Sequence, residues 1–175
     1  MKESAQFPQL PCSNPIVDWL QNMVFMRVVV QRVLSANVAA YECRYSAIGP
    51  GLLVLLGIAP DDDDMDIGWM IRKIAALRIF NDSSGKMNLS LQETKGEVMV
   101  VSQFTLYADT SRGNRPGFSG SASFDHARLI YDCFVRKLEQ KLEKPVKTGW
   151  YGADMQVSLV NDGPVTLIID SPQTL

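Results

Sequence analysis

The uninterrupted apolar run Leu52–Ile58 constrains the possible folds more than any other feature of the sequence. It follows a Gly-Pro-Gly turn at residues 49–51, and it is far shorter than the ~20 residues that a membrane-spanning helix needs. A strand that is covered on both faces has this pattern, because the residues on each face must then be apolar. The run therefore predicts a strand buried on both faces of a sheet.

Most other apolar residues fall into short segments with the alternating pattern of half-buried strands. Val28–Val38 is the longest of these segments. Shorter strands are expected at Tyr41–Ile48, Arg78–Phe80, Lys86–Leu91, Glu97–Val101, Val146–Thr148, Met155–Leu159 and Val165–Ile169.

Two segments have the apolar spacing of helices. One begins after the four aspartates at 61–64 and ends near Leu77, and the other spans Ser123–Leu142. We interpret the aspartates as caps of the first helix rather than as a metal site, because Asp accepts from free first-turn amides and complements the helix dipole. Strands outnumber helices, so the expected fold is a single α+β domain with a largely antiparallel, barrel-like sheet and two packed α-helices.

Composition excludes several classes of site and partner. The 175 residues carry 17 basic and 19 acidic side chains, so a nucleic acid would have to be bound by a local patch. The three cysteines, Cys12, Cys43 and Cys133, are dispersed and form neither a disulfide framework nor a metal motif. They indicate a cytoplasmic protein whose thiols are reduced. His126 is the single histidine, and its position at a helix start predicts an exposed surface residue rather than a catalytic one.

The first 25 residues differ from the rest of the chain. They contain three prolines and no arginine, and they lack the basic start and clean apolar stretch of a signal peptide. We expect residues 1–25 to be a disordered or loosely docked extension, followed by one domain at 26–171 and a tail at 172–175.

Two segments have polar residues that their apolar surroundings do not explain. Val98–Tyr107 is a strand-like segment that contains Ser102, Gln103 and Thr105, and buried polar groups cost free energy unless they are paired. They indicate either a strand end that bonds a sheet edge or a functional site. The second segment is Asn161–Thr166, whose Asn-Asp-Gly sequence predicts a plain hairpin turn, although the following proline lacks the N–H that renewed strand pairing would need.

These segments give the chain a family resemblance. The sequences SQFTL and GPVT, together with MRVVVQRV, KMNLSL and GADMQVSLVNDGPVTL, resemble D-aminoacyl-tRNA deacylases of the bacterial and eukaryotic type over about residues 26–171. The resemblance implies a homodimeric enzyme that hydrolyses the ester of D-aminoacyl-tRNA or glycyl-tRNA without a metal or cofactor. It implies the 3′ end of aminoacyl-tRNA as partner, and neither DNA nor a membrane. Both motifs are intact, which is typical of the strictly chirally selective branch.

The same resemblance implies that Ser102, Gln103, Phe104 and Thr105 line the catalytic pocket. Thr105, or else Ser102, is placed like a nucleophile, but no base is evident to activate either hydroxyl. Main-chain N–H groups near Phe104 and Thr105, with the 2′-hydroxyl of the substrate, are physically easier agents for an ester that is already activated.

Chiral rejection is assigned by the resemblance to Gly163 and Pro164, a cis pair supplied by the partner subunit. Val165 and Thr166 complete this motif, and Arg32 supports it. A wall where an L side chain would point rejects every L-amino acid at once, whereas glycine has no side chain to clash. From its position alone, Arg32 is equally consistent with a strand-surface arginine.

The resemblance also assigns an adenosine site to Tyr151 and Met155, for which ordinary core residues are the alternative. Arg112, Arg115 and Lys86 are the expected, weak contacts to tRNA phosphates, with a solvated loop as the alternative for the two arginines.

Two other functions remain open at this point. One is a small D-amino-acid esterase with a covalent Thr105 or Ser102 nucleophile. The other is a non-catalytic module that binds the 3′ end of tRNA and would bind charged and uncharged tRNA alike.

Overall fold

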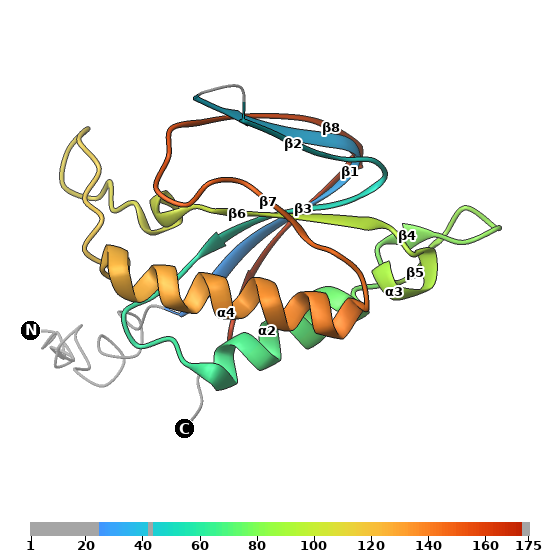
Figure 1. Ribbon diagram of the computed structural model, residues 1–175, viewed down its shortest axis with the longest axis horizontal. Helices are drawn as coiled ribbons and strands as arrows, with labels where there is room; N and C mark the ends of the chain where they lie inside the picture. The colour runs from blue at the N-terminus through green and yellow to red at the C-terminus, as the bar shows by residue number, and fades with distance from the viewer. Residues whose placement is uncertain (1–24, 42–43, 173–175) are drawn as a thin grey trace, which may run out of the picture.

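The computed structural model describes residues 25–41 and 44–172 of the chain. In this part, a six-stranded sheet carries the two long helices on one face, and a two-stranded sheet projects at one end (Figure 1). In chain order the elements are β1 (Arg27–Ala40), β2 (Arg44–Ile48), β3 (Gly51–Gly57), α2 (Asp64–Ala76), β4 (Phe80–Asn81), β5 (Met87–Leu89), α3 (Leu91–Thr94), β6 (Glu97–Ser102), the 3₁₀ helix η1 (Phe104–Tyr107), α4 (Phe124–Leu142), β7 (Lys147–Thr148) and β8 (Met155–Asp170).

Strand β1 is the common partner of three other strands. Its first half, from Arg27 to Val33, pairs antiparallel with β3, and its second half, from Ala36 to Ala40, pairs antiparallel with β2. On its other edge it pairs antiparallel with β8 along nearly its whole length. One long strand thus holds most of the sheet together.

The rest of the sheet is parallel. Strand β6 pairs parallel with β3 and with β7, while β2 also lies near β6 and β7, which curls the sheet toward a barrel. The expected α+β class with a largely antiparallel, barrel-like sheet is confirmed. The short helices α3 and η1 were not predicted, because four residues are too few for helical periodicity to be visible.

Strand β3 separates two apolar cores, as the run Leu52–Ile58 predicts. Leu52, Val54 and Leu56 pack into the core that lies between the sheet and the helices α2 and α4. Leu53 packs on the opposite face, in a smaller core inside the curled sheet. Helix α4 closes the larger core with Phe134 and Leu138, neither of which is exposed to solvent.

The aspartates before α2 cap this helix as predicted. Asp63 is the N-cap and forms a capping box with Asp66. Asp62 is buried instead, and its carboxylate accepts a 2.7 Å hydrogen bond from the amide of Ala59 and another from the amide of Met26. Burial raises the pKa of Asp62 to about 7 despite these hydrogen bonds.

The prediction of a hairpin turn at Asn161–Thr166 is wrong. The two halves of β8 on either side of it both pair with β1 in the same direction, so the chain does not reverse. Asn161 lies opposite Val33 and Thr166 opposite Gln31, and residues 162–165 loop out of the ladder between them. We call residues 162–165 the β8 bulge. The sequence pattern does not distinguish the two structures, because the same residue types form bulges and turns, and both interrupt strand pairing.

The expectations for the extension fall almost entirely on residues 1–24, which lie outside the described residues, as do 173–175 of the tail. No helix within the described ranges is long and apolar enough to cross a membrane.

Replacing Phe134 by alanine tests the core between α4 and the sheet. Phe134→Ala should lower the free energy of unfolding by about 3–5 kcal/mol, because it leaves a cavity at a fully buried position. The control is Leu129→Ala on the same helix, which is 69% exposed and should change stability by no more than about 0.5 kcal/mol. Urea unfolding measures both, and equal losses would contradict this packing.

Replacing Asp62 by asparagine tests the buried carboxylate. The pKa of Asp62 rises from 3.8 in the unfolded chain to about 7 in the folded one. The protonated side chain therefore contributes its full stabilisation below pH 3.8, and this contribution is lost as the pH rises to about 7. As the pH rises from 3.8 to about 7, the free energy of unfolding of Asp62→Asn should therefore increase by up to about 4 kcal/mol relative to that of the wild type, at about 1.4 kcal/mol per pKa unit. A stability difference that does not change with pH in urea unfolding would refute the shift.

Candidate active site

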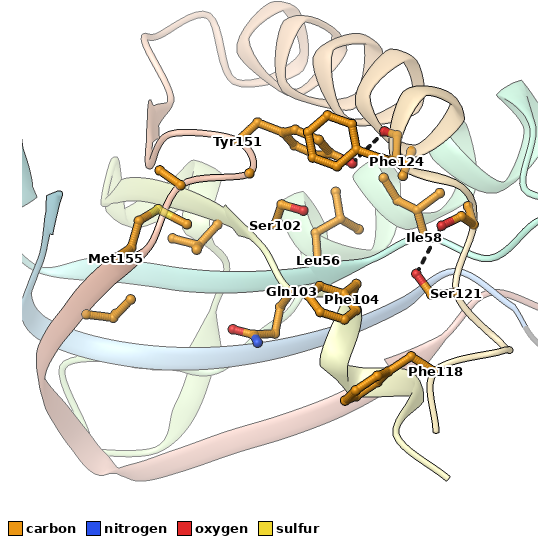
Figure 2. Close-up of a pocket in the computed structure, with 16 residues that line it drawn as sticks. Leu56, Ile58, Ser102, Gln103, Phe104, Phe118, Ser121, Phe124, Tyr151 and Met155 are labelled. Carbon is orange, nitrogen blue, oxygen red and sulfur yellow. Dashed lines mark hydrogen bonds between the residues drawn. The ribbon is translucent and has the colours of Figure 1, made fainter. Parts of the chain in front are cut away.

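A cavity of about 530 Å³ opens where β6 ends and η1 begins. Its size suits a small-molecule group. Figure 2 shows Tyr151 and Phe124 along one wall, Phe104 and Phe118 on the opposite side, and Met155 at one end. The lining residues are Leu56, Ile58, Val101, Ser102, Gln103, Phe104, Phe118, Ser121, Ala122, Phe124, Ala127, Tyr151, Gly152, Ala153, Met155 and Val157.

The wall formed by Tyr151 is held in place by aromatic contacts and one hydrogen bond. Its ring packs edge-on against Phe124 at 5.0 Å and lies 5.6 Å from the ring of Tyr131. The phenol of Tyr151 donates to the carbonyl of Phe124 over 3.0 Å, and burial raises the pKa of this phenol, so it stays neutral. Tyr151 is therefore a half-buried cavity wall rather than an ordinary core residue.

Gly152 allows this wall to form. It has a φ of +73°, and a Cβ atom there would lie 2.8 Å from the ring of Phe124. Any side chain at this position would both strain the backbone and displace Phe124 from Tyr151.

The SQFT segment reaches the cavity because two hydrogen bonds fix η1. The amide of Gln103 donates to the carbonyl of Leu56 over 2.8 Å, at the end of the β3–β6 ladder. At the other end of η1, the buried Tyr107 donates from its hydroxyl to the carbonyl of Phe25 over 2.7 Å. The first amides of a helix have no partner within it, and those of Phe104 and Thr105 form no hydrogen bond to any described residue.

The two candidate nucleophiles occupy different positions. Ser102 lines the cavity, whereas Thr105 is exposed and is not among the lining residues. The hydroxyl of Thr105 accepts a hydrogen bond from the side-chain amide of Gln103. The structure thus brings Ser102, Gln103 and Phe104 together with the predicted adenosine residues, and leaves Thr105 outside the cavity lining.

The single histidine is not where its sequence position predicts. His126 is partly buried rather than exposed, and its Nε2 atom is buried without a hydrogen-bond partner among the described residues. It does not line the cavity. No cluster of three or more His, Cys, Asp or Glu side chains in the described ranges could hold a metal ion. What the cavity offers chemically is apolar surface, the hydroxyls of Ser102, Ser121 and Tyr151, the side-chain amide of Gln103 and main-chain amides.

Arg32 fills the space beneath the β8 bulge. It is only 5% exposed, so it is not the strand-surface residue that its position also allowed. Its Nε atom lies 2.8 Å from the carboxylate of Asp162, and its guanidinium also donates to the carbonyls of Asp162 and Ile79. A single buried cation thus ties the bulge to the chain after α2.

The bulge presents Gly163 and Pro164 to solvent. The bond between them is cis, and Gly163 has a φ of +123° with Arg32 and Val165 so close that a Cβ atom would not fit. The side-chain amide of Asn161 donates to the carbonyls of Arg32 and Val165 and holds the inner side. Neither Gly163 nor Pro164 lines the cavity of the same chain.

The three predicted phosphate contacts are not brought together. Arg112 and Arg115 are exposed in the loop that also supplies Phe118 to the cavity. Lys86 belongs to the β4–β5 hairpin, and Figure 1 shows that hairpin at the opposite end of the molecule from this loop.

Much of the aromatic lining could not be predicted from the sequence. Phe118 lies in a Gly- and Ser-rich loop, and Phe124 fits the apolar spacing of the helix expected at Ser123–Leu142. Phe124 is in fact 61% exposed. Its position in the first turn, one turn before the buried Ala127, was the one available signal that it might not belong to the core.

Comparison with known proteins gives a consistent result. The family model for D-Tyr-tRNA(Tyr) deacylase matches residues 29–170. The chain is 63% identical over 150 residues to the D-aminoacyl-tRNA deacylase of Chlorobium limicola, which is 86% of this chain and 100% of that protein. It is 51% identical over 146 residues to the D-aminoacyl-tRNA deacylase of Cytophaga hutchinsonii, which is 83% of this chain and 97% of that protein.

Two solved structures are similar to this one. The c-Myc DNA Unwinding Element Binding Protein has a TM-score of 0.78 and 40% sequence identity, covering 84% of this chain and 99% of that chain. A probable eukaryotic D-amino acid tRNA deacylase has a TM-score of 0.74 at 17% identity, covering 83% and 98%. The second likeness is one of fold.

Replacing Arg32 by lysine tests how the bulge is held. The guanidinium bonds Asp162 through Nε and Ile79 through a different nitrogen, and the single nitrogen of lysine cannot occupy both positions, so Arg32→Lys should cost about 2–4 kcal/mol of unfolding free energy. Amide exchange at residues 161–166 should also become faster. The control, Arg27→Lys, changes a half-exposed pair with Asp170 and should cost no more than about 1 kcal/mol. Equal, small effects of both substitutions would show that Arg32 does not support the bulge.

Proposed function

The chain belongs to the D-Tyr-tRNA(Tyr) deacylase family, and from this premise we propose that it hydrolyses the ester of D-aminoacyl-tRNA. The products are the free D-amino acid and tRNA, and glycyl-tRNA is a second substrate. The observation that carries the proposal is the cavity, in which an aromatic wall lies next to unused main-chain amides. By removing amino acids of the wrong chirality, the enzyme contributes to proofreading in translation.

The cavity is proposed to bind the terminal adenosine of tRNA. Proteins recognise unpaired RNA bases by stacking them on aromatic side chains, and Tyr151 with Phe124 offers such a surface beside Met155. A nucleoside bound against this wall would direct its ribose ester toward Ser102 and the start of η1, which line the same cavity.

The hydrolysis needs little from side chains. Water adds to the ester carbonyl, the carbonyl oxygen becomes an oxyanion, and the bond to the ribose oxygen then breaks as that oxygen takes a proton. The amides of Phe104 and Thr105 are the proposed donors to the oxyanion. The 2′-hydroxyl of the ribose is the proposed group that orients the water, and it relays a proton by accepting one from the water while donating its own to the departing ribose oxygen. A covalent Thr105 is disfavoured because Thr105 does not line the cavity, its hydroxyl is bonded to Gln103, and no histidine is among the lining residues.

Chiral selection is proposed to require a second copy of the chain. Gly163 and Pro164 do not line the cavity of their own chain, so they can act on a substrate only from a partner subunit. Main-chain carbonyls of a bulge fixed by Arg32 cannot rotate aside, and a wall of this kind excludes L side chains while accepting D side chains and glycine.

The outer edge of β8 supports a homodimer. It is an edge strand, and it exposes apolar side chains next to the bulge, with Val160 52% and Ile168 69% exposed. An open edge with apolar side chains is a surface that other strands or subunits cover.

Deacylation assays test the reaction and its selectivity together. The protein should release amino acid from D-Tyr-tRNA and Gly-tRNA and leave L-Tyr-tRNA intact. Gly163→Ala should reduce the discrimination between D and L esters by about tenfold or more, since each 1.4 kcal/mol lost at the wall is a factor of ten. Thr105→Ala should keep kcat within about a factor of ten, because general acid–base or nucleophilic roles are worth more than that.

Other results would select a different function. Loss of turnover in Thr105→Ala alone would favour a covalent esterase. Hydrolysis of none of the three esters, with equal binding of charged and uncharged tRNA, would leave only a tRNA-end binding module.

A further inference from the structure

A second hollow, of about 640 Å³, lies beside the cavity and shares Tyr151 with it. We call it the α4 groove. One side is the exposed face of α4, and the other is formed by β2 and the segment 148–151. Its lining residues are Arg44, Arg128, Tyr131, Asp132, Val135, Arg136, Glu139, Thr148, Gly149, Trp150 and Tyr151.

The α4 groove is more basic than the chain as a whole. Three arginines line it against two carboxylates, whereas the whole chain has a net charge of −2. One carboxylate, Asp132, is already paired with Arg128 at 3.4 Å. The other, Glu139, accepts a 3.1 Å hydrogen bond from the amide of Val146. A local excess of arginine in an acidic chain is suited to an anionic partner.

Aromatic side chains lie among these arginines. The guanidinium of Arg128 is 5.4 Å from the centre of the Tyr151 ring, on the wall that separates the groove from the cavity. Trp150 lines the groove directly beside Tyr151. Proteins that bind single-stranded nucleic acid combine two features: cations along the phosphate backbone and aromatic rings on which the bases stack.

We infer that the α4 groove binds the unpaired nucleotides that precede the terminal adenosine of tRNA. The inference rests on the proposed function, because an adenosine in the cavity fixes where the preceding strand must leave. A strand that passes over Tyr151 meets Arg128 first and Arg136 further along α4. These two residues are eight apart, which is about 12 Å along the helix, so they contact different phosphates of one short strand.

This inference places the RNA on a different surface from the loop with Arg112 and Arg115. That loop also borders the cavity and supplies Phe118 to it. The ring of Phe118 packs edge-on against Phe104, at 5.1 Å. The α4 groove offers both charge and stacking surface next to the adenosine wall.

The experiment compares two substrates that differ only in the RNA. D-Tyrosyl-tRNA has phosphates and preceding nucleotides, and D-tyrosyl-adenosine has neither. The variant Arg44→Gln/Arg136→Gln removes two charges of the groove without touching the cavity lining. Its kcat/KM for D-tyrosyl-tRNA should fall about 10- to 100-fold relative to its kcat/KM for D-tyrosyl-adenosine, mainly through KM.

The salt dependence gives a second readout. The slope of log kcat/KM for D-tyrosyl-tRNA against log salt should become shallower by about 0.7 in the variant, the value for one single-strand phosphate contact, because Arg136 is the substituted residue that is placed against a phosphate. The control variant Arg72→Gln/Lys73→Gln removes the same charge from the exposed face of α2 and should leave this slope and the substrate ratio unchanged. Trp150→Ala should also lower the substrate ratio, through the stacking surface.

The outcomes separate the two claims. If the wild type hydrolyses D-tyrosyl-adenosine but the groove and control variants lose activity on tRNA equally, the α4 groove is not the RNA site and the proposed function stands. A larger loss in Arg112→Gln/Arg115→Gln than in the groove variant would likewise overturn the inference. If the wild type hydrolyses neither substrate, the proposed function fails and the inference fails with it.

Discussion

The pairing of β1 along both of its edges is the constraint on which the rest of the structure depends. Its first half carries β3, and therefore β6, whose end delivers Ser102 and η1 to the cavity. Its opposite edge carries β8, which begins at Met155 in the cavity and continues to the bulge. Because the same strand positions both motifs, their relative placement is fixed by one continuous set of main-chain hydrogen bonds and not by flexible loops.

A bulge in a long strand needs support that a hairpin turn does not. The ladder is interrupted at residues 162–165, so the groups freed there need other partners. Arg32 and Asn161 supply them from the inner side, with a guanidinium on Asp162 and an amide on two carbonyls. The outward side, with Gly163 and Pro164, is left rigid and exposed. In the dimer that we propose, such an element serves as a fixed wall for a ligand that is bound in a second copy of the chain.

Local periodicity was sufficient to predict the strands, both long helices and the capping role of the aspartates, since these depend on neighbouring residues. The β8 bulge could not be predicted, because its partner in β1 is about 130 residues away in the sequence and the same residue types also form turns. Burial of Arg32 follows from that long-range pairing and was equally hidden. The cavity was predicted in part: Ser102, Tyr151 and Met155 belong to recognisable motifs, whereas Phe118 and Phe124 become neighbours only when the loop before α4 folds back.

The central claim is that adenosine binds against Tyr151 while the bulge of a second copy rejects L side chains. Calorimetric titration with stable 3′-amides of adenosine that carry D- or L-tyrosine tests it directly, because an amide in place of the ester permits binding without turnover. The account predicts that the D compound binds, that Tyr151→Ala weakens it, and that the L compound binds about tenfold or more weakly. Equal affinity for the two compounds, or binding unaffected by Tyr151→Ala, would contradict it.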